Sequence, residues 1–449
     1  MIQRQIFSKA CGWLAATALF SLAGCAPATV TAPAPVISPP ATRALFVDKV
    51  TPAVYELPSG ALATWRQLAG HEPALVVFSA HPFLTPLHDE DRATVRAFVR
   101  EAPPAELVRR GRALVADPVL TSPQTVSAAI EAGLVTEVVY VQPTTRPADK
   151  MSLADFQRNA FAAGFLSEQE ALSLVQRDGV ISGTVRGRPF RCAHPEALPR
   201  IDRPVIVHLD LGYFKDLFVN DIKTPLYDLL HQTVTAIRDA GWPVAAVTLS
   251  YSNQEAEFSL ETRFLISNLA DLLEHPEWLE AGAPPAWKMR ADARMSRAMY
   301  AEGKAAELTA QAAEISPADP DAIYDLAFLR LSQRRTEEGL ALLARAVESD
   351  TGYALAYLEL IEEAVTQGQW KTAEILFSKA IAAFPDNPFI RIGQADQLIR
   401  RERGREALPL LQELQQLPWS SEFHPATPAL LREMIAVATE QAASATPTP

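Results

Sequence analysis

Imidazole, carboxylate and hydroxyl side chains stand at the ends of several apolar runs in this sequence. His208 and Asp210 lie two residues apart in the run 205–211, so on a strand both side chains point to the same face. His81 follows the apolar run 75–79, and the polar segment 250–255 follows another. Imidazole nitrogen and carboxylate oxygen are ligand types that bind a catalytic metal ion. These positions are therefore the first candidates for a functional site.

The surrounding pattern predicts the elements that would position these side chains. Compact apolar strands are expected at 75–79, 136–141, 205–211 and 244–250, and helices at 92–101, 226–240 and 260–274. Continuous apolar strands separated by helices are typical of a mostly parallel α/β sheet. In such sheets the sites form at the carboxyl ends of the strands, where His81, the 208–210 segment and 250–255 all fall.

Residues 70–285 resemble the ureohydrolase (arginase and histone-deacetylase-like) superfamily. In that family one strand ends in Asp-x-His-x-Asp and a later one in Asp-x-Asp, and together they bind metal ions that activate water. This chain has Ser79-Ala80-His81-Pro82-Phe83 and Asp210-Leu211-Gly212-Tyr213-Phe214. His81 and Asp210 match the motif, whereas Ser79, Phe83 and Gly212 stand where carboxylates are expected. The resemblance implies a three-layer α/β fold over 45–285.

The three missing carboxylates argue against a two-metal centre, which needs about five or six charged or imidazole ligands. Two hypotheses follow. In the first, the domain has lost most metal ligands, has no catalytic residue and needs no cofactor. In the second, His81, His208 and Asp210 bind one zinc or manganese ion, and the protein is a hydrolase of C–N bonds that acts on an envelope or small-molecule amide. We favour the first.

Non-catalytic explanations exist for each candidate residue. His81 precedes a proline and could hydrogen-bond at a strand end, and His208 could be a satisfied core histidine. Asp210 would be costly to bury unpaired, so it needs a metal, an arginine or backbone donors. Asp89 and Asp91 fit a solvated loop or helix cap. The remaining candidates are Cys192, expected to be a buried structural cysteine, and Ser79, which lacks the Gly-x-Ser-x-Gly context of a serine nucleophile.

The N-terminus has the features of an export signal. A short positive segment precedes the apolar run 10–22, which is too short to span a bilayer. The run ends in Leu22-Ala23-Gly24-Cys25, which resembles the bacterial lipobox and predicts a signal peptide over 1–24 and acylation of Cys25, for example by palmitate. The Pro/Ala-rich stretch 25–44 would then be a tether. Ala26 in place of Asp favours the outer membrane, facing the periplasm; the alternative is an ordinary cleaved signal.

A repeat is visible after residue 286 when the sequence is compared with itself at a shift of 34 residues. The period resembles the tetratricopeptide repeat, a pair of antiparallel helices, and predicts an all-α solenoid over 286–443 that binds a protein partner. A capping helix is expected at 425–443 and a disordered tail at 444–449. The alternatives are a generic helical bundle and a surface for self-association. The matching positions are Ala293, Ala327, Ile361 and Ala395; Ala305, Gly339, Ala373 and Ala407; Thr309, Leu343, Phe377 and Leu411; and Ala312, Ala346, Ala380 and Leu414.

Composition narrows the remaining functions. The net charge is −12 and no basic cluster stands out, which argues against nucleic-acid binding. Of three cysteines, Cys11 lies in the signal and Cys25 is the acylation candidate, so Cys192 has no intramolecular disulfide partner. The sequence thus predicts a lipid-anchored periplasmic protein that binds a protein or envelope ligand through its repeats.

Overall fold

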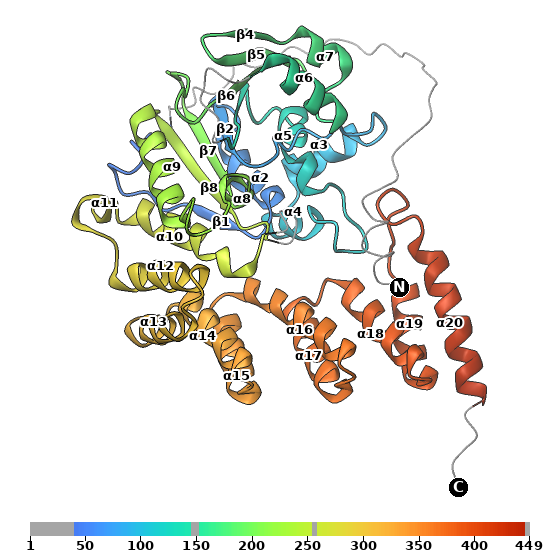
Figure 1. Cartoon of the computed structure of the whole chain (residues 1–449). Coiled ribbons are helices and arrows are strands. Elements are labelled where there is room, and N and C mark those ends of the chain that lie inside the picture. Colours follow the sequence, from blue (N-terminus) through green and yellow to red (C-terminus); the bar gives the residue numbers. More distant parts are fainter. Residues whose placement is uncertain (1–39, 145–151, 254–257, 445–449) are drawn as a thin grey trace, which may run out of the picture. The chain divides into compact units, whose positions relative to one another are not determined.

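A computed structural model describes residues 40–144, 152–253 and 258–444 (Figure 1). The predicted signal 1–24, Cys25, most of the tether 25–44 and residues 445–449 lie outside the described residues, as do positions 254 and 255 of the polar segment. Within the described ranges, no helix combines the length and apolar character needed to cross a membrane.

One mixed sheet forms the centre of the first part of the chain (Figure 1). Its strand order is β1-β8-β7-β2-β3-β6-β5-β4, and every neighbouring pair from β1 to β6 is parallel. The expected mostly parallel α/β sheet is therefore confirmed. The strands are β1 Ala53–Tyr55, β2 Ala74–Phe78, β3 Glu137–Val141, β4 Val175–Arg177, β5 Val180–Val185, β6 Arg188–Ala193, β7 Val205–Asp210 and β8 Val244–Ser250.

Helices cover both faces of this sheet because its central strands are apolar on both sides. Val76 and Phe78 join one hydrophobic cluster with α9 and α10, while Leu75 and Val77 join another with α2, α3 and α5. This alternation follows from the two-residue period of a strand. The helices of this part are η1 Pro58–Ala61, α2 Leu62–Trp65, η2 Arg66–Leu68, α3 Arg92–Glu101, α4 Pro104–Arg110, η3 Ser122–Gln124, α5 Thr125–Glu131, α6 Leu153–Ala162, α7 Glu168–Ser173, α8 Gly212–Leu217, α9 Leu226–Ala240, η5 Leu260–Thr262, α10 Phe264–Glu274 and α11 Trp278–Ala281.

Helix α9 illustrates how the sequence sets an element's end. Leu229, Val234 and Ile237 are buried on one side of the helix, as expected for an amphipathic pattern. Gly241 follows with a φ of 60°, the left-handed conformation that terminates a helix and that glycine adopts without strain. The predicted bounds and the predicted stop are therefore both confirmed.

The antiparallel edge formed by β4, β5 and β6 was not predicted. Its turns are made by Asp178-Gly179 and Arg186-Gly187, all four with positive φ, which is the chemistry of tight hairpins. The strands between them mix polar and apolar residues, so no continuous apolar run marks them. Cys192 lies in β6 and is buried, as expected.

From residue 285 onward the described chain is helical. Helices α12 and α13 pack together, as do α14 and α15, α16 and α17, and α18 and α19, and α20 packs on α19. The second helices of these pairs begin at Glu302, Thr336, Trp370 and Gly404, successive starts that are 34 residues apart. The bounds are α12 Pro285–Ala298, α13 Glu302–Ile315, α14 Pro320–Ser332, α15 Thr336–Ser349, η6 Thr351–Ala354, α16 Leu355–Thr366, α17 Trp370–Ala383, α18 Pro388–Arg400, α19 Gly404–Gln415 and α20 Thr427–Ser444.

The small residues of these pairs sit where the helices approach closely. A Cβ added at Gly339 would lie 2.6 Å from the Leu331 side chain and 3.0 Å from the Ala327 carbonyl oxygen. All sixteen positions that match at the 34-residue shift are buried. The period in the sequence therefore corresponds to the buried side of the helix pairs.

Candidate functional site

The predicted site residues are brought together at the carboxyl ends of β2, β7 and β8. These three strands are neighbours in the sheet and run parallel, so their ends share one edge. The register places His208 beside Thr248 and Asp210 beside Ser250. Because His208 and Asp210 are two residues apart, both side chains point to the same face of β7, as predicted.

Asp210 is buried and its carboxylate is held by four hydrogen bonds. The hydroxyls of Ser250 and Ser252 donate to Oδ2, the backbone N–H of Gly212 donates to Oδ1 at 2.9 Å, and Ser79 Oγ donates to Oδ1 at 3.4 Å. Burial raises the pKa of Asp210, and these hydrogen bonds oppose that shift. The carboxylate thus obtains the donors that its burial requires.

His208 is fully buried, and each ring nitrogen faces a hydroxyl. Nδ1 is 3.0 Å from Thr248 Oγ1, and Nε2 is 3.3 Å from Ser250 Oγ. The edge of Trp65 packs against the imidazole with ring centroids 5.5 Å apart. Burial lowers the pKa of His208 to about 3, so the imidazole is neutral near pH 7.

These groups form one directed hydrogen-bond chain. Trp65 Nε1 can only donate, and it donates to Thr248 Oγ1 at 3.0 Å. At the other end, Ser250 donates to the Asp210 carboxylate. Both ends are then satisfied when Thr248 donates to His208 Nδ1 and His208 Nε2–H donates to Ser250. Such a chain polarises each of its bonds in the same direction and fixes one tautomer of the imidazole.

The residues that stand where the ureohydrolase motif has carboxylates all contact His208 or Asp210. Ser79 and the Gly212 N–H donate to Asp210, and the ring of Phe83 packs against His208 with centroids 6.0 Å apart. Phe83 has a φ of 52° and Ser252 a φ of 46°, left-handed values that are uncommon outside glycine. Strained backbone of this kind persists where the surroundings hold it in place, and here it flanks the polar cluster.

His81 does not join this cluster. Its side chain is exposed and lies against Phe165, with ring centroids 5.5 Å apart, and only its backbone N–H reaches Ser79 Oγ, at 3.3 Å. Across the described ranges, no three His, Cys, Asp or Glu side chains are grouped so that they could hold a metal ion. His208 and Asp210 already use hydroxyl and N–H partners, so this donor set does not fit the predicted three-ligand centre. The site at His81, His208 and Asp210 remains a prediction without geometric support.

The other candidates from the sequence, Asp89, Asp91 and Cys192, lie outside the cluster around His208 and Asp210. Asp89 is exposed and lies 3.6 Å from Arg92, and Asp91 immediately precedes α3. Burial raises the pKa of the Cys192 thiol well above its usual range, so the thiol is unreactive at neutral pH. None of these residues contributes to the cluster around Asp210.

Sequence reasoning missed Trp65 and Thr248 as members of the site, whereas Ser252 belongs to the segment 250–255 that was expected at this edge. Thr248 and Ser250 carry a usable signal, because they are polar residues two apart in an otherwise apolar run and so match the spacing of His208 and Asp210. Trp65 has no such signal, since it comes from a short helix 183 residues away from Thr248. Its role depends on the tertiary fold alone.

The same edge of the sheet contacts the helical region through Arg263. This arginine is 1% exposed and bonds Glu56 Oε2 at 3.0 Å, Asp350 Oδ2 at 2.6 Å and Asp350 Oδ1 at 2.8 Å. Its guanidinium lies 3.3 Å from the centroid of the Tyr251 ring, next to Ser252. Burial would lower the pKa of Arg263, but Glu56 and Asp350 outweigh it and raise the pKa. A cation therefore links the Asp210 cluster to helix pair α16 and α17 through η6.

Further contacts join later parts of the helical region to the segment 112–116, which follows α4. Ser420 N donates to Ala116 O at 2.8 Å, and His424 Nε2 lies 2.8 Å from Val115 O. Arg112 reaches Asp386 at 3.3 Å. The helical region is thus attached to the α/β part at several points rather than by the connecting chain alone.

A scan against protein-family models and a search of curated proteins each found no match to this sequence. The ureohydrolase resemblance therefore rests on the sequence motifs alone.

Proposed function

We propose that this protein is a lipid-anchored recognition protein of the bacterial envelope, in which an α/β domain without catalytic function carries a partner-binding helical module. The module would be a tetratricopeptide-repeat solenoid over 286–443, and the α/β domain a ureohydrolase-like fold that has lost most of its metal ligands. Acylation of Cys25 would hold both at the outer membrane, on the periplasmic side. The proposal has three separate supports.

The observation that carries the proposal is the surroundings of Asp210. Where the family motif would supply further metal ligands, this chain supplies Ser79, Phe83 and Gly212, and each of them contacts His208 or Asp210 instead. A carboxylate that accepts four hydrogen bonds and a neutral imidazole between two hydroxyls fit a stable core network better than a metal centre. This favours a structural over a catalytic role for the edge.

The repeat assignment is supported by spacing and burial together. The starts of α13, α15, α17 and α19 repeat at 34 residues, and the sixteen matched positions are buried. Stacked helix pairs of this kind bury one continuous core and leave an extended surface for proteins or peptides. Helical repeats of this kind seldom catalyse reactions, so we infer that this module recognises a protein or peptide partner.

The lipid anchor is supported by the sequence alone, because Cys25 lies outside the described residues. Metabolic labelling with a palmitate analogue should mark the protein, and Cys25→Ala should abolish the label. Unlabelled wild-type protein that keeps an unmodified amino end would contradict the anchor.

Photo-crosslinking in intact cells tests the recognition role. A photoreactive residue is placed at exposed apolar positions of the helical region and, as matched controls, at exposed apolar positions of the α/β part. We expect covalent protein adducts from the helical positions only; adducts from neither set, or only from the controls, would contradict the proposal. The helical positions are Tyr300, Ile315, Ile375 and Val437, and the controls are Phe161 and Leu172.

A further inference from the structure

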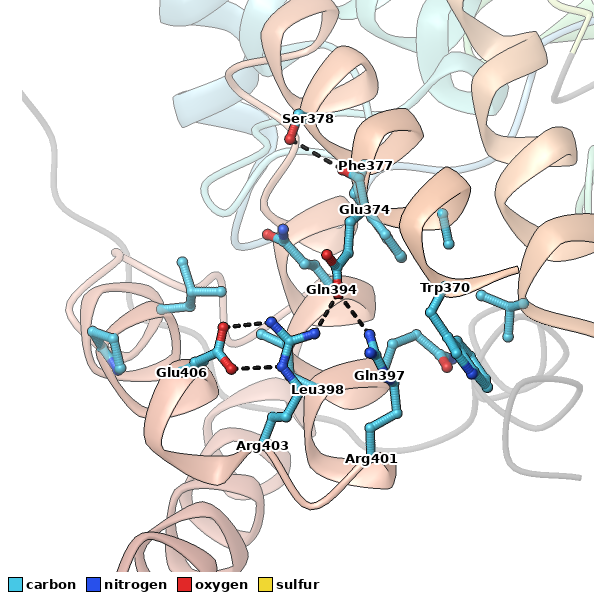
Figure 2. A pocket seen from close by; sticks show the side chains of 14 residues that line it. Trp370, Glu374, Phe377, Ser378, Gln394, Gln397, Leu398, Arg401, Arg403 and Glu406 are labelled. Carbon is cyan, nitrogen blue, oxygen red and sulfur yellow. Dashed lines mark hydrogen bonds and ion pairs between the residues drawn. The ribbon is translucent and has the colours of Figure 1, made fainter. Parts of the chain in front are cut away.

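Ion pairs in the later part of the helical region balance one another (Figure 2). In the groove between α17, α18 and α19, Arg403 bonds both Glu406 and Glu374, and Arg401 Nη1 bonds Glu374 Oε1 at 2.6 Å. Hydrogen bonds from the two arginines lower the pKa of Glu374. Two guanidiniums and two carboxylates neutralise each other, so we expect this groove to be insensitive to pH near neutrality.

The buried ion cluster at the start of the helical region is not balanced in this way. Arg290 of α12 is 2% exposed; its Nε donates to Asp325 Oδ2 at 3.1 Å and its Nη2 donates to Asp319 Oδ2 at 3.2 Å. Asp321, in the first turn of α14, is 4% exposed and accepts no hydrogen bond from an arginine within the described ranges. Three carboxylates therefore share one guanidinium, which already bonds two of them.

Tyr353 supplies Asp321 with a hydroxyl instead of a cation. This tyrosine lies on η6, is 1% exposed, and donates its hydroxyl hydrogen to Asp321 Oδ1. Because an ionised carboxylate is costly to bury, burial raises the pKa of Asp321. The neighbouring carboxylates Asp319 and Asp325 add to this shift, and Arg290 and Tyr353 oppose it without cancelling it. The Asp321 carboxyl thus keeps its proton to a higher pH than an exposed aspartic acid does.

The surroundings of Asp321 come from both sides of the contact between the helical region and the α/β part. The Arg263 guanidinium, which bonds Asp350 on one side and Glu56 on the other, lies 5.6 Å from the centroid of the Tyr353 ring. A change of charge at Asp321 therefore acts on groups of both parts. The charged and titratable groups around Asp321 and Tyr353 are Arg290 on α12, Asp319 and Asp325 on α14, Tyr227 on α9, Tyr251 after β8 and Arg263 before α10.

We propose that Asp321, Arg290 and Tyr353 form a pH-sensitive latch between the helical region and the α/β part. While Asp321 carries a proton, each ionised carboxylate of the cluster bonds Arg290 and the contact stays closed. Loss of the proton leaves a third carboxylate buried without a bonded cation, which favours local opening into water. The contact is therefore tightest at mildly acidic pH and loosens as the pH rises. The latch does not depend on the proposed partner recognition.

The sign of this pH dependence is opposite to that of the buried, neutral His208. An exposed aspartic acid ionises near about pH 3.9, and the folded-state pKa of Asp321 is higher, so opening of the contact releases a proton. Opening becomes easier with rising pH until the folded-state pKa is passed. Global unfolding would add the opposing contributions of Asp321 and His208, whereas local hydrogen exchange separates them.

Hydrogen exchange of the full chain in detergent is measured by mass spectrometry on peptides from α14 and η6, at about pH 5.5 and about pH 8.5. Asp321→Asn keeps the shape of the side chain but cannot ionise. Parent and variant are compared at the same pH, so that the intrinsic exchange rate cancels. The ratio of the parent's rate to the variant's rate should rise by about tenfold or more between the two pH values. The matched control Asp292→Asn, at an exposed position of α12, should show no such rise.

Two more variants keep the test decisive. Asp321→Ser, smaller and equally neutral, should give the same rise if Asp321→Asn does not fold. Tyr353→Phe removes a hydroxyl that opposes the pKa shift, so its exchange relative to the parent should be faster at the higher pH than at the lower pH. Loss of a merely structural hydrogen bond would speed exchange equally at both. A parent-to-variant ratio for the Asp321 variants that is constant or falls with pH would overturn the latch, as would an equal rise for Asp292→Asn.

Discussion

His208 should make the stability of this protein depend on pH in a way that a single substitution removes. Its folded-state pKa is about 3, because the ring is buried, whereas an exposed histidine titrates near 6.5. The His208 imidazole is therefore protonated below about pH 6.5 in the unfolded chain, but only below about pH 3 in the folded chain. Stability falls as the pH drops through this window, by about 2 kcal/mol between pH 8 and pH 5. His208→Gln replaces the imidazole with an amide that does not titrate, so this pH dependence should be lost.

Urea unfolding of both proteins at pH 8 and pH 5, with a chelator present throughout, measures the effect. Burial also lowers the pKa of His424, but that group is unchanged in the variant, so its contribution cancels in the comparison. The wild-type protein should lose about 2 kcal/mol more than His208→Gln over this interval. Equal losses in the two proteins would show that His208 is not a buried neutral imidazole and would refute the account of the cluster.

Three further substitutions test the packing around this cluster and its link to the helices. Asp210→Ala leaves three hydroxyls and the Gly212 N–H without their acceptor and should lower the unfolding free energy by about 3 kcal/mol. The control Asp202→Ala, at an exposed position, should change the unfolding free energy by less than about 0.5 kcal/mol. Similar losses in the two variants would contradict the hydrogen-bond network around Asp210. Gly352→Ala would place a Cβ 2.2 Å from the Arg263 guanidinium carbon and should lower the unfolding free energy, measured with urea, by about 2 kcal/mol. The control Gly303→Ala in α13 places its Cβ where no atom lies within 4 Å and should be neutral or stabilising. An unchanged stability of Gly352→Ala would argue against the close packing of Gly352 on Arg263. Arg263→Met leaves Glu56 and Asp350 without their cation and should lower the unfolding free energy by about 3 kcal/mol. The backbone amides of 251–253 should then exchange hydrogen faster. Unchanged exchange at 251–253 would show that Arg263 does not couple the helical region to the residues around Asp210.

The sequence was most informative where a single physical signal dominates. The apolar runs predicted the central strands β2, β3, β7 and β8, because strands buried on both faces tolerate few polar residues. Gly241 marked the end of α9 for a local reason, since its left-handed backbone follows directly from the residue type. The edge hairpin of β4 to β6 carried no such run and was missed.

The candidate site was only partly visible for a related reason. The two-residue spacing predicted that His208 and Asp210 share a face. Their position at the end of an apolar run predicted that they lie at the carboxyl-terminal edge of the sheet. Ser250 and Ser252, which bond Asp210, belong to the segment that was expected at this edge, whereas the contacts of Trp65 and Thr248 with this cluster were not predicted. His81 matched the motif, yet its side chain turns outward to Phe165, and nothing in the order of residues indicates that direction.

Metal analysis of the full chain, purified in detergent from cells grown with added zinc and manganese, tests the central claim most directly. If His208 and Asp210 are satisfied by protein groups alone, the chain should hold far less than one metal ion and a chelator should not lower its melting temperature. About one tightly bound zinc or manganese ion per chain, lost in both His208→Gln and Asp210→Asn, would contradict the claim and favour a metal-dependent hydrolase.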